Sequence, residues 1–298
     1  MMMARVNNIK TNALSVAEEG RIVWLASYPK SGNTWFRSFL TALQSGKEID
    51  DLNQLKMDAV FSSKLWLESV LDLDSFYLSD NQIQRYRRLV YTYLSENASE
   101  NFFVKIHDAF TFSVEDKYPL IPEEPSKLAI YFVRNPLDVA LSLMNHQGKD
   151  TDYVIDSYIN DVNGYFGEKK NSSNNQFNQP LGTWSMHVES WLTKPRFPVH
   201  FMRYEDMKVK PFETFKAAVE AIGMEVTDEQ IQGAIEATEF EKLQKKEQEK
   251  GFKEKAIPTS NFFFKGQVGR WKEELTPAQI ERIRTVNEPM MRHFGYWE

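Results

Sequence analysis

The 298-residue chain contains no cysteine, and this absence removes several kinds of chemistry at once. It excludes disulfide bonds, thiolate metal ligands, cysteine nucleophiles and thiol redox switching. A chain without cysteine is compatible with a reducing compartment, so we expect a cytoplasmic protein.

A long apolar run is also missing. No stretch approaches the roughly 20 apolar residues that cross a bilayer, and residues 1–20 lack the apolar core of a signal peptide. We therefore expect a soluble protein with no membrane partner, whose residues 1–20 are disordered. The net charge of −6 disfavours nonspecific binding to nucleic acid.

Neither an internal repeat nor a Pro/Gly/Ser-rich linker divides the chain, so residues 21–298 are predicted to form a single domain. Apolar runs and amphipathic stretches alternate along it, which predicts an α/β fold. The expected strands cover residues 22–27, 102–108, 127–133 and 198–202. The expected helices cover residues 33–44, 80–94, 184–192, 211–222 and 227–237, with a last helix from Thr276 to about Met291.

The rest of the chain is organised around the stretch Trp24-Leu-Ala-Ser-Tyr-Pro-Lys-Ser-Gly-Asn-Thr-Trp35, where an apolar strand enters a tight turn and then a helix. Small residues in the turn let backbone N–H groups approach an anion, and the positive end of the helix points at the same place. Lys30, Ser31 and Thr34 add a charge and two hydroxyl donors. These features indicate a phosphate-binding loop; the alternative is an ordinary strand-to-helix turn with a solvated lysine.

Two later strands end in polar residues of the types that bind and process anions. Period-two geometry puts Lys105 and His107 on one face at the end of the strand Phe102-Phe-Val-Lys-Ile-His-Asp108. If this strand is parallel to the first, both residues lie at a carboxyl edge of the sheet, where ligands of open α/β sheets bind. The alternative is a histidine that a neighbouring loop satisfies.

The strand at residues 127–133 leads into Arg134, with Asn135 as the expected N-cap and Pro136 as the first helical residue. Arg134 and Ser142 could reach one anion at this helix mouth; the alternatives are a surface salt bridge and a back-bonded serine. Near the C-terminus, Phe262-Phe-Phe-Lys-Gly-Gln-Val-Gly-Arg-Trp-Lys272 suits a loop that folds over an anionic ligand. The mixed-charge run at residues 245–255 has no apolar period and is predicted to be solvated.

Taken together, four stretches in this order resemble the cytosolic-type sulfotransferase family, whose donor is 3′-phosphoadenosine 5′-phosphosulfate (PAPS). Tyr28-Pro-Lys-Ser-Gly-Asn-Thr-Trp35 is similar to the family's 5′-phosphosulfate loop, and Val104-Lys-Ile-His107 to its Lys-x-His strand. Arg134-Asn-Pro-Leu-Asp-Val-Ala-Leu-Ser142 resembles its 3′-phosphate motif, and Lys265-Gly-Gln-Val-Gly-Arg-Trp-Lys272 its C-terminal segment. The resemblance covers nearly the whole chain, from residue 22 to residue 291.

The resemblance implies a P-loop-like, three-layer α/β/α fold with a central parallel sheet, and a reaction that needs no metal. It assigns the 5′-phosphosulfate to Lys30, Ser31, Gly32, Asn33 and Thr34, and the 3′-phosphate to Arg134, Ser142, Lys265 and Gly266. It assigns the adenine pocket to Trp35, Tyr204, Thr238 and Phe240. His107 would be the base for a hydroxyl or amine acceptor, with Lys30 and Lys105 stabilising charge on the departing phosphate and the transferred sulfuryl group.

Four positions depart from the usual family pattern. Asn33 stands where threonine is common, and Phe264 replaces an arginine, which removes one charged contact to the 3′-phosphate. Arg270 replaces an aspartate, and its charge is a candidate for compensating that loss. Pro277 replaces a valine in the segment that resembles the family's dimerisation motif, so both a monomer and a homodimer stay open.

Two alternative functions share the same start of the chain. A P-loop kinase or NTPase should show Gly-x-x-x-x-Gly-Lys-Ser/Thr, but here Lys30 precedes the only glycine of the loop. A non-catalytic nucleotide-binding protein of the same fold is the second alternative. The aromatic segments at residues 61–77 and 110–112 favour a small, partly apolar acceptor.

Overall fold

The computed structural model describes residues 21–55, 59–112, 118–167, 176–255 and 261–297. The expected disorder of residues 1–20 lies outside the described residues. A five-stranded sheet has the order β2-β3-β1-β4-β7, and every pairing in it is parallel. Its strands are β1 (Ile22–Ser27), β2 (Ala59–Val60), β3 (Phe102–Ile106), β4 (Ser126–Val133) and β7 (Val199–Arg203). A small antiparallel hairpin joins β5 (Tyr165–Phe166) and β6 (Gln179–Pro180).

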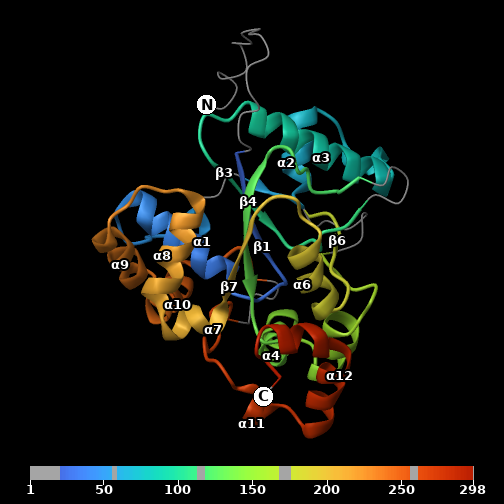
Figure 1. Ribbon diagram of the computed structural model, residues 1–298, viewed down its shortest axis with the longest axis vertical. Coiled ribbons are helices and arrows are strands. Elements are labelled where there is room, and N and C mark those ends of the chain that lie inside the picture. Colours follow the sequence, from blue (N-terminus) through green and yellow to red (C-terminus); the bar gives the residue numbers. More distant parts are fainter. Residues whose placement is uncertain (1–20, 56–58, 113–117, 168–175, 256–260, 298) are drawn as a thin grey trace.

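Helices cover both faces of the five-stranded sheet, which gives three layers (Figure 1). The α-helices are α1 (Asn33–Ser45), α2 (Lys64–Leu71), α3 (Asp80–Glu96), α4 (Pro136–Gln147), α5 (Thr151–Val154), α6 (Trp184–Thr193), α7 (Tyr204–Val209), α8 (Pro211–Ile222), α9 (Asp228–Ala237), α10 (Phe240–Lys250), α11 (Trp271–Glu274) and α12 (Pro277–His293). Shorter helical segments are the 3₁₀-helices η2 (Leu52–Gln54) and η3 (Ser75–Tyr77) and the π-helix η4 (Ile155–Ile159). The α/β class, the parallel sheet and the three layers are therefore confirmed.

The central strand β1 shows why the sheet has two covered faces. Ile22, Trp24 and Ala26 pack into a core with α4, α6 and α12, whereas Val23 and Leu25 pack into a second core with α1, α8 and α9. All six residues of β1 are buried, as expected of a strand that is covered on both sides. Figure 1 shows α1, α8 and α9 on one side of the sheet and α6 and α12 on the other.

The predicted helix starts are confirmed by their capping bonds. The Asn135 side chain accepts a hydrogen bond from the Leu137 N–H, and Pro136 is the first residue of α4. Capping boxes open α9 at Thr227 and α12 at Thr276. Pro277 is the first residue of α12, where its missing N–H is not needed.

The parallel arrangement brings the ends of four strands to one edge of the sheet. β1 ends at Ser27, β3 at Ile106, β4 at Val133 and β7 at Arg203. Ala26 pairs with Ile106 on one side and with Tyr131 on the other, so the three central strands are in close register. The residues that follow these strands therefore converge, and the site is built from them.

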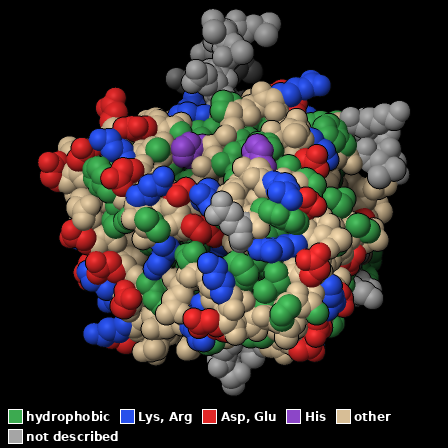
Figure 2. Space-filling model, turned by 60° about the horizontal axis from the view of Figure 1, so that its bottom comes forward, with side chains coloured by type: hydrophobic (Ala, Val, Ile, Leu, Met, Phe, Trp, Pro, Cys, Tyr) green, Lys and Arg blue, Asp and Glu red, His purple; other side chains and the backbone are tan. Residues whose placement is uncertain are grey.

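Two further observations concern the surface. Figure 2 shows acidic and basic side chains interspersed over one face of the molecule. No helix within the described ranges is both long enough and apolar enough to span a membrane.

Candidate active site

The loop between β1 and α1 is held in a conformation that needs its particular residues. Lys30 and Gly32 have positive φ angles of 68° and 106°. A Cβ atom at Gly32 would also lie 2.9 Å from the Tyr204 ring, so only glycine fits there. Gly32 is the N-cap of α1 and provides no side-chain cap, so the first amides of the helix are left for another partner.

Buried polar atoms around this loop also lack partners. Ser31 Oγ and Trp35 Nε1 have no hydrogen-bond partner among the described residues, although both atoms are buried. Such orphaned donors are costly unless a ligand satisfies them. By contrast, the Asn33 side chain donates to the Leu25 carbonyl oxygen at 2.8 Å and so braces the loop from within. The loop therefore offers hydroxyl, amide and ammonium donors to an anion.

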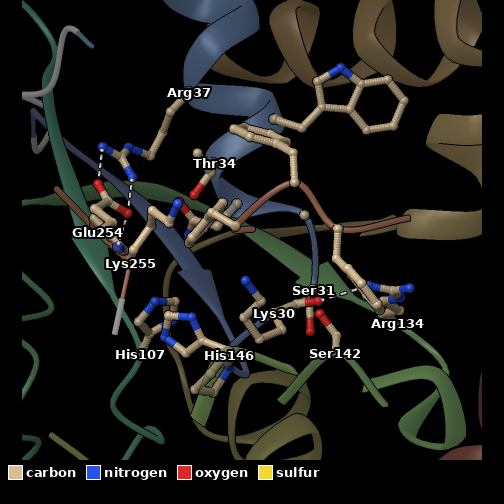
Figure 3. A pocket seen from close by; sticks show the side chains of 18 of the residues that line it. Lys30, Ser31, Thr34, Arg37, His107, Arg134, Ser142, His146, Glu254 and Lys255 are labelled. Atoms are coloured by element: carbon tan, nitrogen blue, oxygen red, sulfur yellow. Dashed lines mark hydrogen bonds and ion pairs between the residues drawn. The ribbon is translucent and has the colours of Figure 1, made fainter. Parts of the chain in front are cut away.

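The loop forms part of a cavity of about 850 Å³, which collects almost all the predicted site residues. The predicted residues in its lining are Lys30, Ser31, Gly32, Asn33, Thr34, Trp35, Lys105, His107, Arg134, Ser142, Tyr204, Phe240, Lys265 and Gly266. Thr238 is the exception: its side chain is buried, and its hydroxyl donates to the Ala234 carbonyl oxygen at 2.8 Å. Figure 3 shows several of these side chains converging from separate strands and loops.

His107, directly after β3, is held as a neutral imidazole with one nitrogen tied to the backbone. Its Nδ1 lies 2.9 Å from the Ser27 carbonyl oxygen, which can only accept, and 3.1 Å from the Ser27 hydroxyl, which can accept or donate; the carbonyl contact favours a proton on Nδ1. Nε2 is thereby left as the basic nitrogen. Burial, with the nearby Lys105 charge, holds the pKa of His107 well below its usual value.

A second histidine fixes the backbone of the first. His187 on α6 donates from Nε2 to the His107 carbonyl oxygen at 2.9 Å and accepts at Nδ1 from the Tyr131 hydroxyl at 2.7 Å. Burial lowers the pKa of His187 to about 4, so this ring is neutral as well. The His187 side chain is fully buried, so it acts from within the core.

Lys30 occupies a half-buried position in which its charge is poorly compensated. Burial and the neighbouring Arg134 guanidinium lower the pKa of Lys30 to about 7. Its ammonium lies 3.6 Å from the centre of the Phe262 ring, a cation–π contact. A bound anion would supply the opposite charge that this lysine lacks.

The carboxylate of Glu254 bridges two cations at the opposite wall (Figure 3). It lies 2.9 Å from Lys105 Nζ and 2.9 Å from an Arg37 guanidinium nitrogen. Burial opposes ionisation of Glu254, but Lys105 and Arg37 outweigh it and hold the pKa of the carboxyl below its usual range.

The run at residues 245–255 was predicted to be solvated, and this prediction is wrong for the side chains of Glu247 and Glu254. Glu254 belongs to the bridge just described, and Glu247 is buried, where it accepts hydrogen bonds from the Phe262 and Phe263 amides. The run looks solvated in sequence because its buried carboxylates find their partners far away in the chain.

Arg134 ties together the two loops at the other end of the cavity. It donates to the carbonyl oxygens of Lys30 and Gln267 at 3.2 Å each, and its guanidinium stacks 4.2 Å from the centre of the Tyr204 ring. The Arg134 Nε atom is buried without a partner in the described structure. The Asp138 carboxylate accepts from the Gly269 amide at 2.7 Å and so anchors the C-terminal segment to α4.

Gly266 lies against an aromatic ring where no other residue fits. A Cβ atom at this position would be 2.5 Å from the Phe240 ring, and its φ angle is 61°. Lys208 stands near both aromatic rings of this region, 5.4 Å from the centre of Trp35 and 5.5 Å from that of Phe240. The end of the cavity beyond Arg134 thus combines flat apolar rings with basic side chains.

The two departures at positions 264 and 270 are neighbours in space. The Arg270 guanidinium lies 5.2 Å from the centre of the Phe264 ring, and both residues line the cavity. Arg270 is paired with Glu274 at 2.6 Å, and Lys265 shares that carboxylate at 3.2 Å. A positive charge is therefore present beside Phe264.

Sequence reasoning missed several residues of the cavity. Arg37 was hidden in an apolar helical stripe, although an arginine in such a stripe signals a buried ion pair. His146 lies four residues after Ser142, on the same side of α4, and this spacing was a usable signal. Nothing in the sequence indicated that Glu254 reaches Lys105.

The aromatic side chains from which the acceptor class was predicted lie outside the cavity lining. Phe61 and Phe110 are buried in the core, and Phe76 and Tyr77 are exposed on the surface. None of the four lines the large cavity. The reason given for a partly apolar acceptor is therefore wrong, and the acceptor has to be inferred from the cavity itself.

Comparison with known protein families gives a match over nearly the whole chain. The family model described as "Sulfotransferase domain" matches residues 21–295. The flavonol 3-sulfotransferase of Flaveria bidentis is 25% identical over 275 residues, which cover 88% of this chain and 78% of that protein. Sulfotransferase 1E1 of Bos taurus is 26% identical, with 90% and 82% covered.

Solved structures show the same fold. Retinol dehydratase in complex with androsterone and the inactive cofactor PAP superposes with a TM-score of 0.58 at 17% identity, covering 92% of this chain and 82% of that one. The mouse sulfotransferase SULT7A1 complexed with PAP gives a TM-score of 0.55 at 20% identity, covering 91% and 84%. At these identities the likeness concerns the fold.

We predict that Glu254→Gln lowers the free energy of unfolding at pH 7 by roughly 1–3 kcal/mol, because Arg37 and Lys105 lose a charged, hydrogen-bonded partner. The folded-state pKa of Glu254 is depressed, so its contribution is complete above the ordinary value of 4.5 and is lost as the pH falls through the folded value. The difference from wild type should narrow only below pH 4.5. Urea unfolding across this range measures it, with the exposed Glu249→Gln as control; equal loss in both variants would contradict the bridge.

Proposed function

The chain belongs to the sulfotransferase domain family, and on that premise we propose that it transfers the sulfuryl group of PAPS to a hydroxyl group of a small molecule. Relatives that are described as cytosolic sulfotransferases support a cytoplasmic enzyme. The observation that carries the proposal is the convergence of an uncapped, lysine-bearing loop and a neutral histidine on one cavity.

The residues present fit the donor at both of its charged ends. The loop from Lys30 to Thr34 would hold the 5′-phosphosulfate, since its orphaned hydroxyl and free helix amides are donors without partners. Arg134, Ser142, Lys265 and Gly266 would hold the 3′-phosphate, and Arg270 would add the charge that Phe264 does not supply. Trp35, Tyr204 and Phe240 would enclose the adenine. Thr238 would support that wall only from behind, since its hydroxyl is already used.

Each residue at the reacting centre has a role that follows from its chemistry. When bound, PAPS supplies the sulfuryl group, whose bond to the 5′-phosphate oxygen breaks as a bond to the acceptor oxygen forms. His107 Nε2 takes the proton that the acceptor oxygen loses, because Nδ1 is committed to Ser27. Lys30 neutralises charge on the departing phosphate, and Lys105, positioned by Glu254, stabilises the sulfuryl oxygens.

We expect the purified protein to bind 3′-phosphoadenosine 5′-phosphate (PAP) tightly in isothermal titration calorimetry and to show no binding of ATP–Mg²⁺. The 3′-phosphate of PAP meets a basic wall that ATP has no group to engage. Arg134→Met should weaken PAP binding by about tenfold or more, since a charge-assisted contact is lost. Binding of ATP–Mg²⁺ alone would overturn the proposed function and favour a kinase.

PAP affinity should fall as the pH rises above 7. The pKa of Lys30 is lowered to about 7 in the ligand-free protein, so the ammonium that binds phosphate is increasingly lost from pH 7 to pH 9. Because the bound anion favours the charged form, binding takes up a proton, and the dissociation constant should rise by up to about tenfold per pH unit. Calorimetric titrations in buffers of different ionisation enthalpy measure how many protons are taken up when PAP binds. Lys30→Met should bind weakly and without this slope; an unchanged slope would place the titration elsewhere.

His107→Ala should reduce kcat by roughly 10²- to 10⁴-fold, as expected for loss of a general base. Its dissociation constant for PAP should stay within about threefold of wild type, which separates a catalytic defect from misfolding. His200→Ala, a replacement on β7 outside the cavity lining, is the matched control. Turnover is measured with radiolabelled PAPS and phenolic acceptors. Near-normal turnover by His107→Ala would refute the assignment of the base.

A further inference from the structure

His146 is a buried polar group that has no role in the proposed reaction. It lies on α4, is 6% exposed and lines the large cavity. Its ring packs nearly parallel to that of Phe166, with centroids 6.1 Å apart and planes at 19°, and contacts the edge of Phe262 at 5.9 Å. Aromatic contacts on two sides fix the orientation of this imidazole.

The same aromatic rings place His146 beside the reacting centre. His107 contacts Phe166 at 5.8 Å between ring centroids, and the Lys30 ammonium lies over Phe262. His146 contacts the same Phe166 ring, both histidines line the cavity, and the charge of Lys30 acts on His146; Figure 3 draws the three side chains in the same part of the cavity. A small acceptor with its hydroxyl at His107 Nε2 would therefore have His146 within reach of its neighbouring atoms.

The chemical state of His146 limits what it can recognise. Burial and the charges of Lys30 and Lys105 lower the pKa of His146 to about 3, so the ring is neutral. A neutral imidazole offers one donor and one acceptor, and neither nitrogen has a hydrogen-bond partner in the described structure. Ser62, also in the lining, is buried with an unpartnered hydroxyl. This part of the cavity is therefore aromatic but not apolar.

We propose that His146 contacts the acceptor and selects aromatic hydroxyl compounds that carry a second, uncharged oxygen group ortho to the reacting hydroxyl, as catechol does. The inference rests on the proposed sulfuryl transfer and names its acceptor class. The flat ring of such a compound suits Phe166 and Phe262, and the second oxygen satisfies His146. An ammonium group in that place would be repelled by the charges of Lys30 and Lys105. The Glu254 carboxylate would not offset this repulsion, because it already bridges Arg37 and Lys105.

The test compares kcat/KM for catechol and for phenol in wild type and in His146→Phe. Phenylalanine keeps the stacking on Phe166 but removes both nitrogens. Wild type should prefer catechol by about tenfold or more, because a site built to hydrogen-bond an oxygen discriminates against the analogue that lacks it. His146→Phe should lower this ratio to about two, the statistical factor for two hydroxyls. His293→Phe, an exposed histidine on α12, is the matched control.

Each other outcome would overturn the proposal in a recognisable way. Equal loss of both acceptors in His146→Phe would assign the residue to proton transfer or to structure. A wild-type enzyme that binds PAP but turns over neither compound, or both equally, would refute the acceptor class and leave the donor assignment intact. The wild-type ratio should also be constant from pH 6 to pH 8, since a neutral His146 does not titrate there; a change of the ratio near pH 6.5 would contradict its neutral state.

Discussion

The structure depends on concentrating positive charge in a cavity that is largely withdrawn from water. Lys30, Lys105, Arg37 and Arg134 converge there, and Glu254 is the carboxylate that bridges two of them. Burial lowers the pKa of Lys30 and keeps nearby histidines neutral, and repulsion between the like charges of the cavity adds to this effect. Under the proposed function, an anionic donor would relieve this repulsion when it binds. The charges that would attract the donor also favour an unprotonated His107, as the proposed role of this residue as general base requires.

The parallel sheet is what brings these charges together. β1 lies between β3 and β4, so the residues that follow the three strands meet at one edge although they are far apart in the chain. The sequence allowed this to be predicted because each site residue follows an apolar strand: Lys30 after β1, His107 after β3 and Arg134 after β4. Strand direction then places them without any knowledge of side-chain contacts. The capping residues of α4, α9 and α12 were likewise readable, since a cap depends on neighbours in sequence.

The parts that sequence reasoning missed depend on contacts between distant segments. Glu254 stands in a run of alternating charges that carries no apolar period, and only the fold shows that it reaches Arg37 and Lys105. His146 lies near the C-terminal end of α4, and its significance comes from Phe166 on the β5 hairpin and Phe262 near the C-terminus. The local sequence pattern determines whether a segment is a helix or a strand and where it begins and ends. It does not identify the partner of a long side chain that crosses the cavity.

The positions where this chain departs from the family pattern are also best understood in space. An arginine at position 264 next to Arg270 and Lys265 would place three cations around the single carboxylate of Glu274, which already pairs with two. With phenylalanine at 264, the Arg270 guanidinium instead lies against an aromatic face, where the ring quadrupole favours a cation. Phe264 and Arg270 therefore form one arrangement in space, and the compensation of the lost charge by Arg270 stays a prediction that PAP binding tests.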